Sequence, residues 1–153
     1  MAGPARLSAY RGRRMLNLPI SDIMNDHPIK VVASTSVRNV AHLMMRYRIN
    51  GVLVMREEDP EKLLGVFTTR DLMDIMEEAL SQGGHKMQAL TWLGEQPVKD
   101  FVAEDPPSLQ VTENAAKAIV LMHLKDAVTL PVFDGEKIVG VVGRHDIINI
   151  AFA

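Results

Sequence analysis

The sequence predicts an α+β protein made of two repeats that are related by a pseudo-twofold axis. A glycine-led stretch occurs twice, as GVFTTRD at residues 65–71 and as GVVGRHD at residues 140–146. The segments before the two copies also match, and Ile20 and Val98 occupy corresponding positions 78 residues apart. Within each half, the apolar pattern alternates between short strands and longer helices. We therefore expect each repeat to run helix, strand, helix, strand, strand, helix.

Each repeat is expected to open with a short helical turn, at residues 20–24 and 98–102. Proline follows both turns, and the residue before a proline is biased towards extended structure. The chain is therefore predicted to enter two short strands, at residues 31–32 and 109–111.

A longer helix is expected after each first strand. Ser34 and Thr112 are suitable N-cap residues, and the helices behind them are predicted to end near Arg48 and Lys125. Apolar residues lie on more than one side of both helices, so we expect the core or a partner subunit to cover them. The residues outside the main apolar faces are Leu43, Met45, Val120, Leu121 and Leu124.

The second and third strands of each repeat are expected to pair through a hairpin. Residues 51–55 and 129–133 form short apolar strands, and each third strand leads into the repeated glycine. Asp134 and Gly135 favour a tight turn in the second hairpin. The loop of the first hairpin is longer, is charged and contains Pro60, so we expect it to be exposed to solvent.

The linker between the repeats contains a short helical pattern at residues 87–93. Trp92 is the sole tryptophan, and we expect it to anchor this linker by packing. The predicted segments are a flexible basic arm at 1–18, a first repeat at 19–80, a connector at 81–95 and a second repeat at 96–153.

The repeated stretch is typical of a strand, a tight turn and a helix, with Asp71 or Asp146 in the first helical turn. Unpaired N–H groups at a helix N-terminus attract phosphate, and a carboxylate can accept from both hydroxyls of a ribose. The pattern also fits a structural role, because Thr68 and Asp71 have the spacing of a capping box. Gly143 lacks the hydroxyl while Asp146 remains, which favours a ligand interpretation but leaves the cap open.

Composition excludes several functional classes. The chain is 47% hydrophobic and 24% charged, as in ordinary globular proteins, and it has no cysteine for disulfides, thiolate metal sites or a cysteine nucleophile. No metal-spaced histidine pair, nucleophile elbow or Walker loop occurs, so an enzyme is not expected. No apolar run could span a bilayer and no secretory signal is apparent, so we expect a cytoplasmic protein without a membrane partner.

The net charge of −2 is unevenly distributed. Arg6, Arg11, Arg13 and Arg14 precede the first acidic residue, Asp22, whereas the rest of the chain is acidic. The arm could contact nucleic acid, but a solubilising tail or a partner-docking segment is the favoured interpretation. Aromatic residues make up only 5% of the chain, which also disfavours base stacking.

The order of elements, the strand LPVFD at residues 130–134 and the stretch at residues 65–71 resemble the CBS domain, named after cystathionine β-synthase. The resemblance covers residues 19–152, and two such domains in tandem form a Bateman module. It implies that clefts between the repeats bind an adenosine-containing ligand: AMP, ADP, ATP, NAD or S-adenosylmethionine. It also implies a sensor without catalytic activity of its own, and a homodimer formed through the helices that would cover the surplus apolar surface.

The resemblance also implies two sets of ligand-binding residues. In the first site, Thr68 would lie on the phosphate side, Asp71 would bind the ribose and Val66 would line the adenine pocket. The opposite repeat would complete this site with Pro107, Ser108 and Leu109.

In the second site, Asp146 would bind the ribose and Val141 would line the adenine pocket, opposite Pro28, Ile29 and Lys30. Gly143 departs from the Ser or Thr of the family pattern, so strong phosphate binding is in doubt there. Arg144 or His145 could supply positive charge instead, or this site could have lost its ligand.

The leading hypothesis is therefore a regulatory module that senses adenosine-containing nucleotides and acts on a regulated protein partner. One alternative is a protein-interaction or dimerisation module with vestigial sites. The other is nucleic-acid binding through the basic N-terminal arm, which we rank last.

Overall fold

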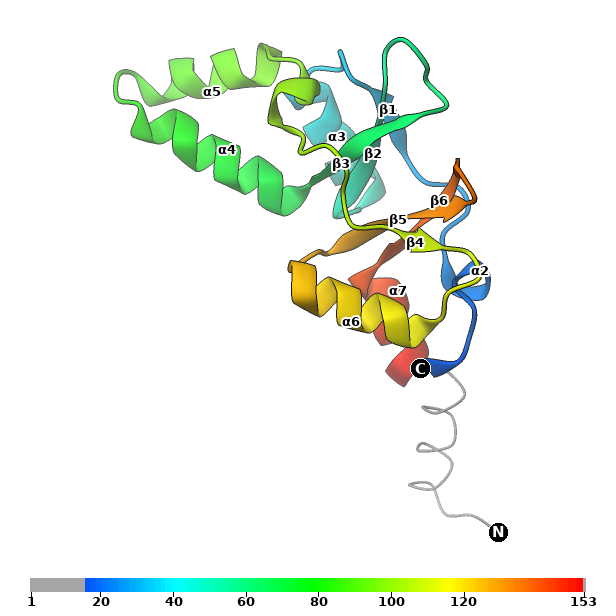
Figure 1. Ribbon diagram of the computed structural model, residues 1–153. Helices are drawn as coiled ribbons and strands as arrows, with labels where there is room; N and C mark the ends of the chain where they lie inside the picture. The colour runs from blue at the N-terminus through cyan, green and yellow to red at the C-terminus, as the bar shows by residue number, and fades with distance from the viewer. Residues whose placement is uncertain (1–15, 153) are drawn as a thin grey trace. The chain divides into compact units, whose positions relative to one another are not determined.

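The computed structural model describes residues 16–152, which form two compact units (Figure 1). We call residues 28–106 the first-sheet unit, and residues 16–27 together with 107–152 the second-sheet unit. Each unit contains one three-stranded sheet with helices, which confirms the predicted α+β class and the two repeats. Most of the predicted basic arm lies outside the described residues.

The first-sheet unit is built on a sheet with strand order β1-β2-β3. β1 pairs with β2 in parallel, so the chain crosses over through a helix, while β2 and β3 form an antiparallel hairpin. Its elements are β1 (Lys30–Val32), α3 (Val37–Tyr47), β2 (Gly51–Met55), β3 (Leu63–Thr68), α4 (Thr69–Ser81), α5 (Lys86–Glu95) and the 3₁₀ helix η1 (Val98–Phe101). The core of this unit consists of Val31, Val40, Met44, Val52, Val54, Phe67 and Val98.

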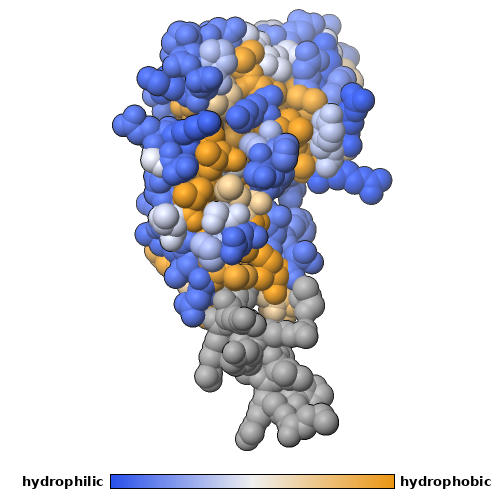
Figure 2. Space-filling view, turned by 90° about the vertical axis from the view of Figure 1, so that its right-hand side faces the viewer, coloured by the Kyte–Doolittle hydropathy of each residue, from blue (hydrophilic) through white to orange (hydrophobic). Residues whose placement is uncertain are grey.

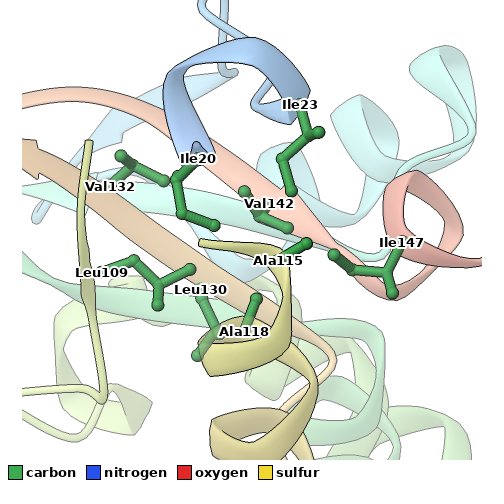
Figure 3. Close-up of a cluster of buried hydrophobic side chains, with 9 residues drawn as sticks. All are labelled: Ile20, Ile23, Leu109, Ala115, Ala118, Leu130, Val132, Val142 and Ile147. Carbon is green, nitrogen blue, oxygen red and sulfur yellow. The ribbon is translucent and has the colours of Figure 1, made fainter. Parts of the chain in front are cut away.

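The second-sheet unit repeats this plan with strand order β4-β5-β6. Again the first strand pairs in parallel and the third in antiparallel orientation. Its elements are α2 (Ile20–Ile23), β4 (Leu109–Gln110), α6 (Ala115–Lys125), β5 (Thr129–Asp134), β6 (Lys137–Gly143) and α7 (Arg144–Phe152). Figure 3 shows its core, formed by Ile20, Ile23, Leu109, Ala115, Ala118, Leu130, Val132, Val142 and Ile147.

The short helix that opens each sequence repeat folds with the sheet of the other repeat. Ile20 belongs to the first repeat, yet its N–H donates to the carbonyl of Glu113 at 2.7 Å. In the reciprocal arrangement, the N–H of Val98 donates to the carbonyl of Thr35 at 2.8 Å. The two compact units therefore do not coincide with the two sequence repeats. The domain boundaries predicted at residues 18, 80 and 95 remain predictions.

The residues just after these short helices lie against the third strand of each sheet. In the second-sheet unit, Asn25 and Val141 exchange main-chain hydrogen bonds of 2.8 and 3.0 Å. A Cβ atom on Gly140 would lie 2.6 Å from the carbonyl oxygen of Asn25, and one on Gly65 would lie 2.5 Å from that of Ala103. Only glycine leaves room for this contact.

The predicted N-caps at Ser34 and Thr112 are wrong by two residues. α3 begins after Ser36, whose side chain accepts from the N–H of Asn39, and α6 begins after Asn114. The shift arises because each strand ends in a turn before its helix; in the first, the N–H of Thr35 donates to Val32. Ser34 instead donates its hydroxyl to Glu57 at 2.9 Å.

The linker helix and the hairpin turn follow the prediction, whereas Trp92 does not. α5 covers the predicted residues 87–93, and Gly135 has a φ of +63° in the tight turn between β5 and β6. Trp92 is 57% exposed, so the expectation of a packing anchor is wrong. Leu93 fills that role instead, since it is the buried residue of α5.

Apolar side chains remain on the surface of several helices, as the overlap of apolar faces predicted. Leu124 on α6 is 71% exposed, and Val120, Ile148 and Phe152 on α6 and α7 are exposed as well. Figure 2 shows apolar patches among hydrophilic side chains on the face that it presents. Within residues 16–152, no helix has both the length and the apolar character needed to cross a membrane.

Replacing Gly140 or Gly65 by alanine should destabilise the protein, because the added methyl group would collide with main-chain atoms. We expect each change to lower the free energy of unfolding by about 1–3 kcal/mol. Thermal denaturation followed by circular dichroism would measure this. Gly143→Ser is the matched control, since a Cβ there meets nothing closer than 3.5 Å. Equal melting temperatures for Gly140→Ala and Gly143→Ser would contradict the close-contact argument.

Candidate functional site

The first repeated turn joins β3 to α4 and contains a complete capping box. The N–H of Asp71 donates to the Thr68 hydroxyl oxygen at 3.2 Å. In return, the N–H and the hydroxyl of Thr68 donate to Oδ2 of Asp71, at 2.8 and 3.0 Å. The structural interpretation of this pair is therefore correct, and any ligand role must be compatible with it.

These hydrogen bonds leave part of the Asp71 carboxylate available. All three bonds that hold the turn involve Thr68, and the two that the carboxylate accepts both end on Oδ2. Oδ1 therefore retains its capacity to accept from a hydroxyl. The next residue is held as well, because the N–H of Thr69 donates to the carbonyl of Asn50 at 2.8 Å.

The second repeated turn joins β6 to α7 with half of this arrangement. The N–H of Gly143 donates to Oδ2 of Asp146 at 2.7 Å, and position 143 offers no hydroxyl. The N–H of Arg144 donates to the carbonyl of Val128 at 3.1 Å, which matches the bond of Thr69 in the first turn. Asp146 thus points in the same way as Asp71 relative to its own strand and helix.

The third strand that leads to each aspartate carries the predicted adenine-pocket valine. Val66 on β3 and Val141 on β6 are half-buried. Met24 and Asn25 lie against Gly140, directly before Val141, and Val102 and Ala103 lie against Gly65, directly before Val66. Each half-site therefore consists of a valine, a helix start with a carboxylate, and a neighbouring segment from the other sequence repeat.

The remaining predicted residues belong to the opposite unit in each case. Ser108 and Leu109 lie in the second-sheet unit, and Ile29 and Lys30 lie in the first-sheet unit. Their meeting with the predicted aspartates remains a prediction. Leu109 is 1% exposed and packs in its own core, so only its main chain could contact a ligand (Figure 3). Ser108, Lys30 and Arg144 are exposed, and Ile29 is half-buried.

Sequence reasoning missed the contribution of Met24, Asn25, Val102 and Ala103 to the surroundings of the third strands. The signal was the glycine that heads each repeated stretch, because a strand interior rarely contains glycine without a close backbone neighbour. The repeat pattern alone could not identify that neighbour, since it places these four residues at the start of their own repeats.

One carboxyl outside these turns has a shifted pKa. The main-chain N–H of Gln110 donates to Glu113 and lowers its pKa, Lys117 at 3.2 Å lowers it further, and partial burial opposes both effects. Glu113 therefore stabilises the fold above its unfolded pKa, and this contribution is lost as the pH falls through the folded value. Within the described residues, no group of three His, Asp or Glu side chains could hold a metal ion.

The CBS domain family model matches residues 20–78 and 98–152, and the chain belongs to this family. The matched segments contain both repeated turns, so the predicted resemblance is confirmed.

Two larger proteins contain a region that is similar to this chain. The chain is 27% identical over 139 residues to the A-adding tRNA nucleotidyltransferase of Geobacter sulfurreducens, which covers 86% of the chain and 13% of that enzyme. It is also 27% identical over 116 residues to the magnesium transporter MgtE of Thermus thermophilus, covering 76% of the chain and 24% of the transporter. The chain therefore spans a quarter or less of these relatives.

Solved structures share the fold over nearly the whole chain. An uncharacterized conserved protein from Pyrococcus horikoshii has a TM-score of 0.72 at 20% identity, covering 90% of this chain and 95% of its own. CBSX2 in complex with AMP has a TM-score of 0.66 at 22% identity, with 87% and 95% covered. The CBS domain pair of MJ0100 was solved in complex with 5′-methylthioadenosine and S-adenosyl-L-methionine. It has a TM-score of 0.67 at 19% identity, and the match covers 87% of this chain and 94% of that chain.

Thr68→Ala should lower the free energy of unfolding by about 1 kcal/mol, because it removes the hydroxyl that caps α4. Chemical denaturation would measure the loss. Thr69→Ala is the control, since the hydroxyl of Thr69 makes only a 3.4 Å contact with Asn50. If both variants lose the same stability, the capping box contributes nothing beyond an ordinary surface threonine.

Proposed function

We propose that this chain is a regulatory module that binds an adenosine-containing ligand at each of its two repeated turns. The observation that carries the proposal is that Asp71 and Asp146 are fixed by main-chain N–H groups at the starts of α4 and α7. Membership of the CBS domain family supports it. So do two proteins of the same fold, one holding AMP and the other 5′-methylthioadenosine and S-adenosylmethionine.

The chemistry of the first turn suits a nucleoside with a phosphate. Oδ2 of Asp71 is occupied by Thr68, so Oδ1 would accept from a ribose hydroxyl. N–H groups in the first turn of α4 carry the positive end of the helix dipole and would attract the phosphate. Val66, which is half-buried on β3, would contact the adenine. Ser108 and the main chain of Leu109 would complete this pocket.

The second turn would bind the ribose through Asp146 and the adenine through Val141, with Ile29 and Lys30 from the opposite unit. It lacks a hydroxyl at Gly143, and a Cβ there would meet nothing closer than 3.5 Å, so space is available beside the helix start. Arg144 is exposed next to this space and could pair with a phosphate. The choice among AMP, ADP, ATP, NAD and S-adenosylmethionine would therefore differ between the two turns.

Regulation would arise from a difference in ligand affinity between two arrangements of the module or of a bound protein partner. The proposal assigns no catalytic step to this chain. It includes a homodimer, because exposed Val120, Leu124, Ile148 and Phe152 give α6 and α7 an apolar surface of the kind that subunit contacts cover. If the turns are vestigial, which the missing hydroxyl at Gly143 favours, the same surface would serve an interaction module.

Isothermal titration calorimetry with AMP, ADP, ATP, NAD and S-adenosylmethionine should detect binding of at least one ligand. Asp71→Ala should weaken binding at the first turn by about 10–100-fold, because a charge-assisted hydrogen bond contributes about 1.5–3 kcal/mol. Asp146→Ala should do the same at the second turn. Asp74→Ala is the matched control, since this carboxylate is exposed on the same helix as Asp71.

The stoichiometry would report whether the turn with Gly143 binds a ligand. Loss of cap stability must be separated from loss of affinity, so each variant would first be checked by thermal denaturation. Binding that is unchanged in both Asp71→Ala and Asp146→Ala would refute the assignment of these carboxylates. If none of the five ligands binds measurably, the interaction-module alternative would be favoured.

A further inference from the structure

Helix α5 lies in the linker between the two segments that the family model matches. It spans Lys86–Glu95, which falls in the gap between the family matches at residues 20–78 and 98–152. In the first-sheet unit it lies beside α4 as a helical hairpin (Figure 1). α5 therefore lies outside both matched segments and contains none of the residues assigned to the repeated turns.

The inner side of α5 is firmly packed. Leu93 is 3% exposed, and α5 contacts both α3 and α4. Gly94 allows the Arg38 side chain of α3 to lie across the helix, because a Cβ at that position would be only 3.2 Å from its guanidinium. The helix is thus held against α3 and α4 on its inner side, and its outer side faces away from them.

The outer side of α5 exposes large apolar residues. Met87 is 63% exposed and Trp92 is 57% exposed. Both side chains are large and apolar, so burying them against a partner would be energetically favourable. A shallow depression of about 340 Å³ runs along this side and is lined by Met87, Gln88, Thr91, Trp92 and Glu95. Tryptophan is one of the residue types enriched at binding hot spots.

The hairpin that carries this surface is acidic. Residues 69–95 contain five acidic and two basic residues, a balance of −3. Asp74, Glu77, Glu78 and Glu95 are exposed, and none of them forms an ion pair within residues 16–152. Two copies of this hairpin would repel each other across a twofold axis, whereas a positively charged partner would be attracted.

We infer that the outer side of α5 is a docking surface for a basic amphipathic helix of another protein. Apolar residues at i, i+3 and i+4 of that helix would cover Trp92 and Met87, and flanking lysines or arginines would meet Glu95 and the carboxylates of α4. The inference goes beyond nucleotide binding, since α5 contains none of the residues assigned to the repeated turns.

The test uses the full chain and a 14-residue helix-forming peptide of leucine and lysine, with leucine at i, i+3 and i+4 spacing. Binding should shift the emission of Trp92 to shorter wavelength, a direct signal because the chain has no other tryptophan. Anisotropy of the labelled peptide gives the affinity. A peptide with glutamate in place of lysine should bind at least tenfold more weakly. Trp92→Ala and Glu95→Lys should each weaken binding of the lysine peptide at least tenfold.

The matched control is Met45→Ala, which removes an exposed methionine from α3 and should leave binding unchanged. Equal affinity for the two peptides, or affinity unaffected by Trp92→Ala, would overturn the proposal. A dimer that Trp92→Glu dissociates in light scattering would assign the surface to a second copy and also overturn it. So would a shift of Trp92 emission on deletion of residues 1–15, which would assign it to the basic arm. Nucleotide titration of Trp92→Ala, which should match the parent, separates this failure from failure of the nucleotide sites.

Discussion

The close approach of backbone to backbone at Gly65 and Gly140 is the contact on which the rest of the fold depends. Each glycine lets the segment that opens one sequence repeat lie on the third strand of the other sheet. Neither hydrophobic core is complete without residues from the other repeat, since Ile20 and Ile23 pack in the core of the second-sheet unit and Val98 in that of the first-sheet unit. Each contact joins residues that are far apart in the sequence, so its formation closes a long loop at a cost in conformational entropy. Both repeats are ordered by the same contacts, so they share this cost. The same contact brings the opening segment next to the third strand, which ends at Thr68 or Gly143 and leads into the helix that carries Asp71 or Asp146.

The repeated turn shows why a structural role and a binding role are hard to separate from sequence. Thr68 and Asp71 form a full capping box, so the pattern is explained by helix capping alone. However, the bonds to Thr68 use one carboxylate oxygen and leave the other, which is held in a fixed direction. A group that is already ordered loses little entropy when it binds. In this turn the cap would therefore prepare the carboxylate for the proposed ligand, and the second turn has the carboxylate bond without a hydroxyl at position 143.

Most of the local structure could be predicted from sequence, because apolar periodicity and turn residues determine it. The order of the elements within each repeat, the helix ends at Arg48 and Lys125 and the turn at Gly135 follow from such patterns. The N-caps could not be placed exactly, since Ser34 and Ser36 are both suitable and only the turn after β1 selects the second. The pairing of Asn25 with Val141 was also beyond reach, because it joins segments that the repeat assigns to different halves. The capping geometry of Asp71 was predictable from its spacing to Thr68. The ligand roles of the aspartates and of the residues opposite them remain predictions, because they depend on long-range geometry.

The departures from the pseudo-twofold plan are concentrated in the first-sheet unit and at Gly143. The two repeats need only their shared elements to build their two cores, so α5, which has no counterpart in the element order of a repeat, requires a different explanation. α4 starts at the capped turn of Thr68 and packs along α5, so one helix joins the proposed nucleotide turn to the exposed surface of Trp92.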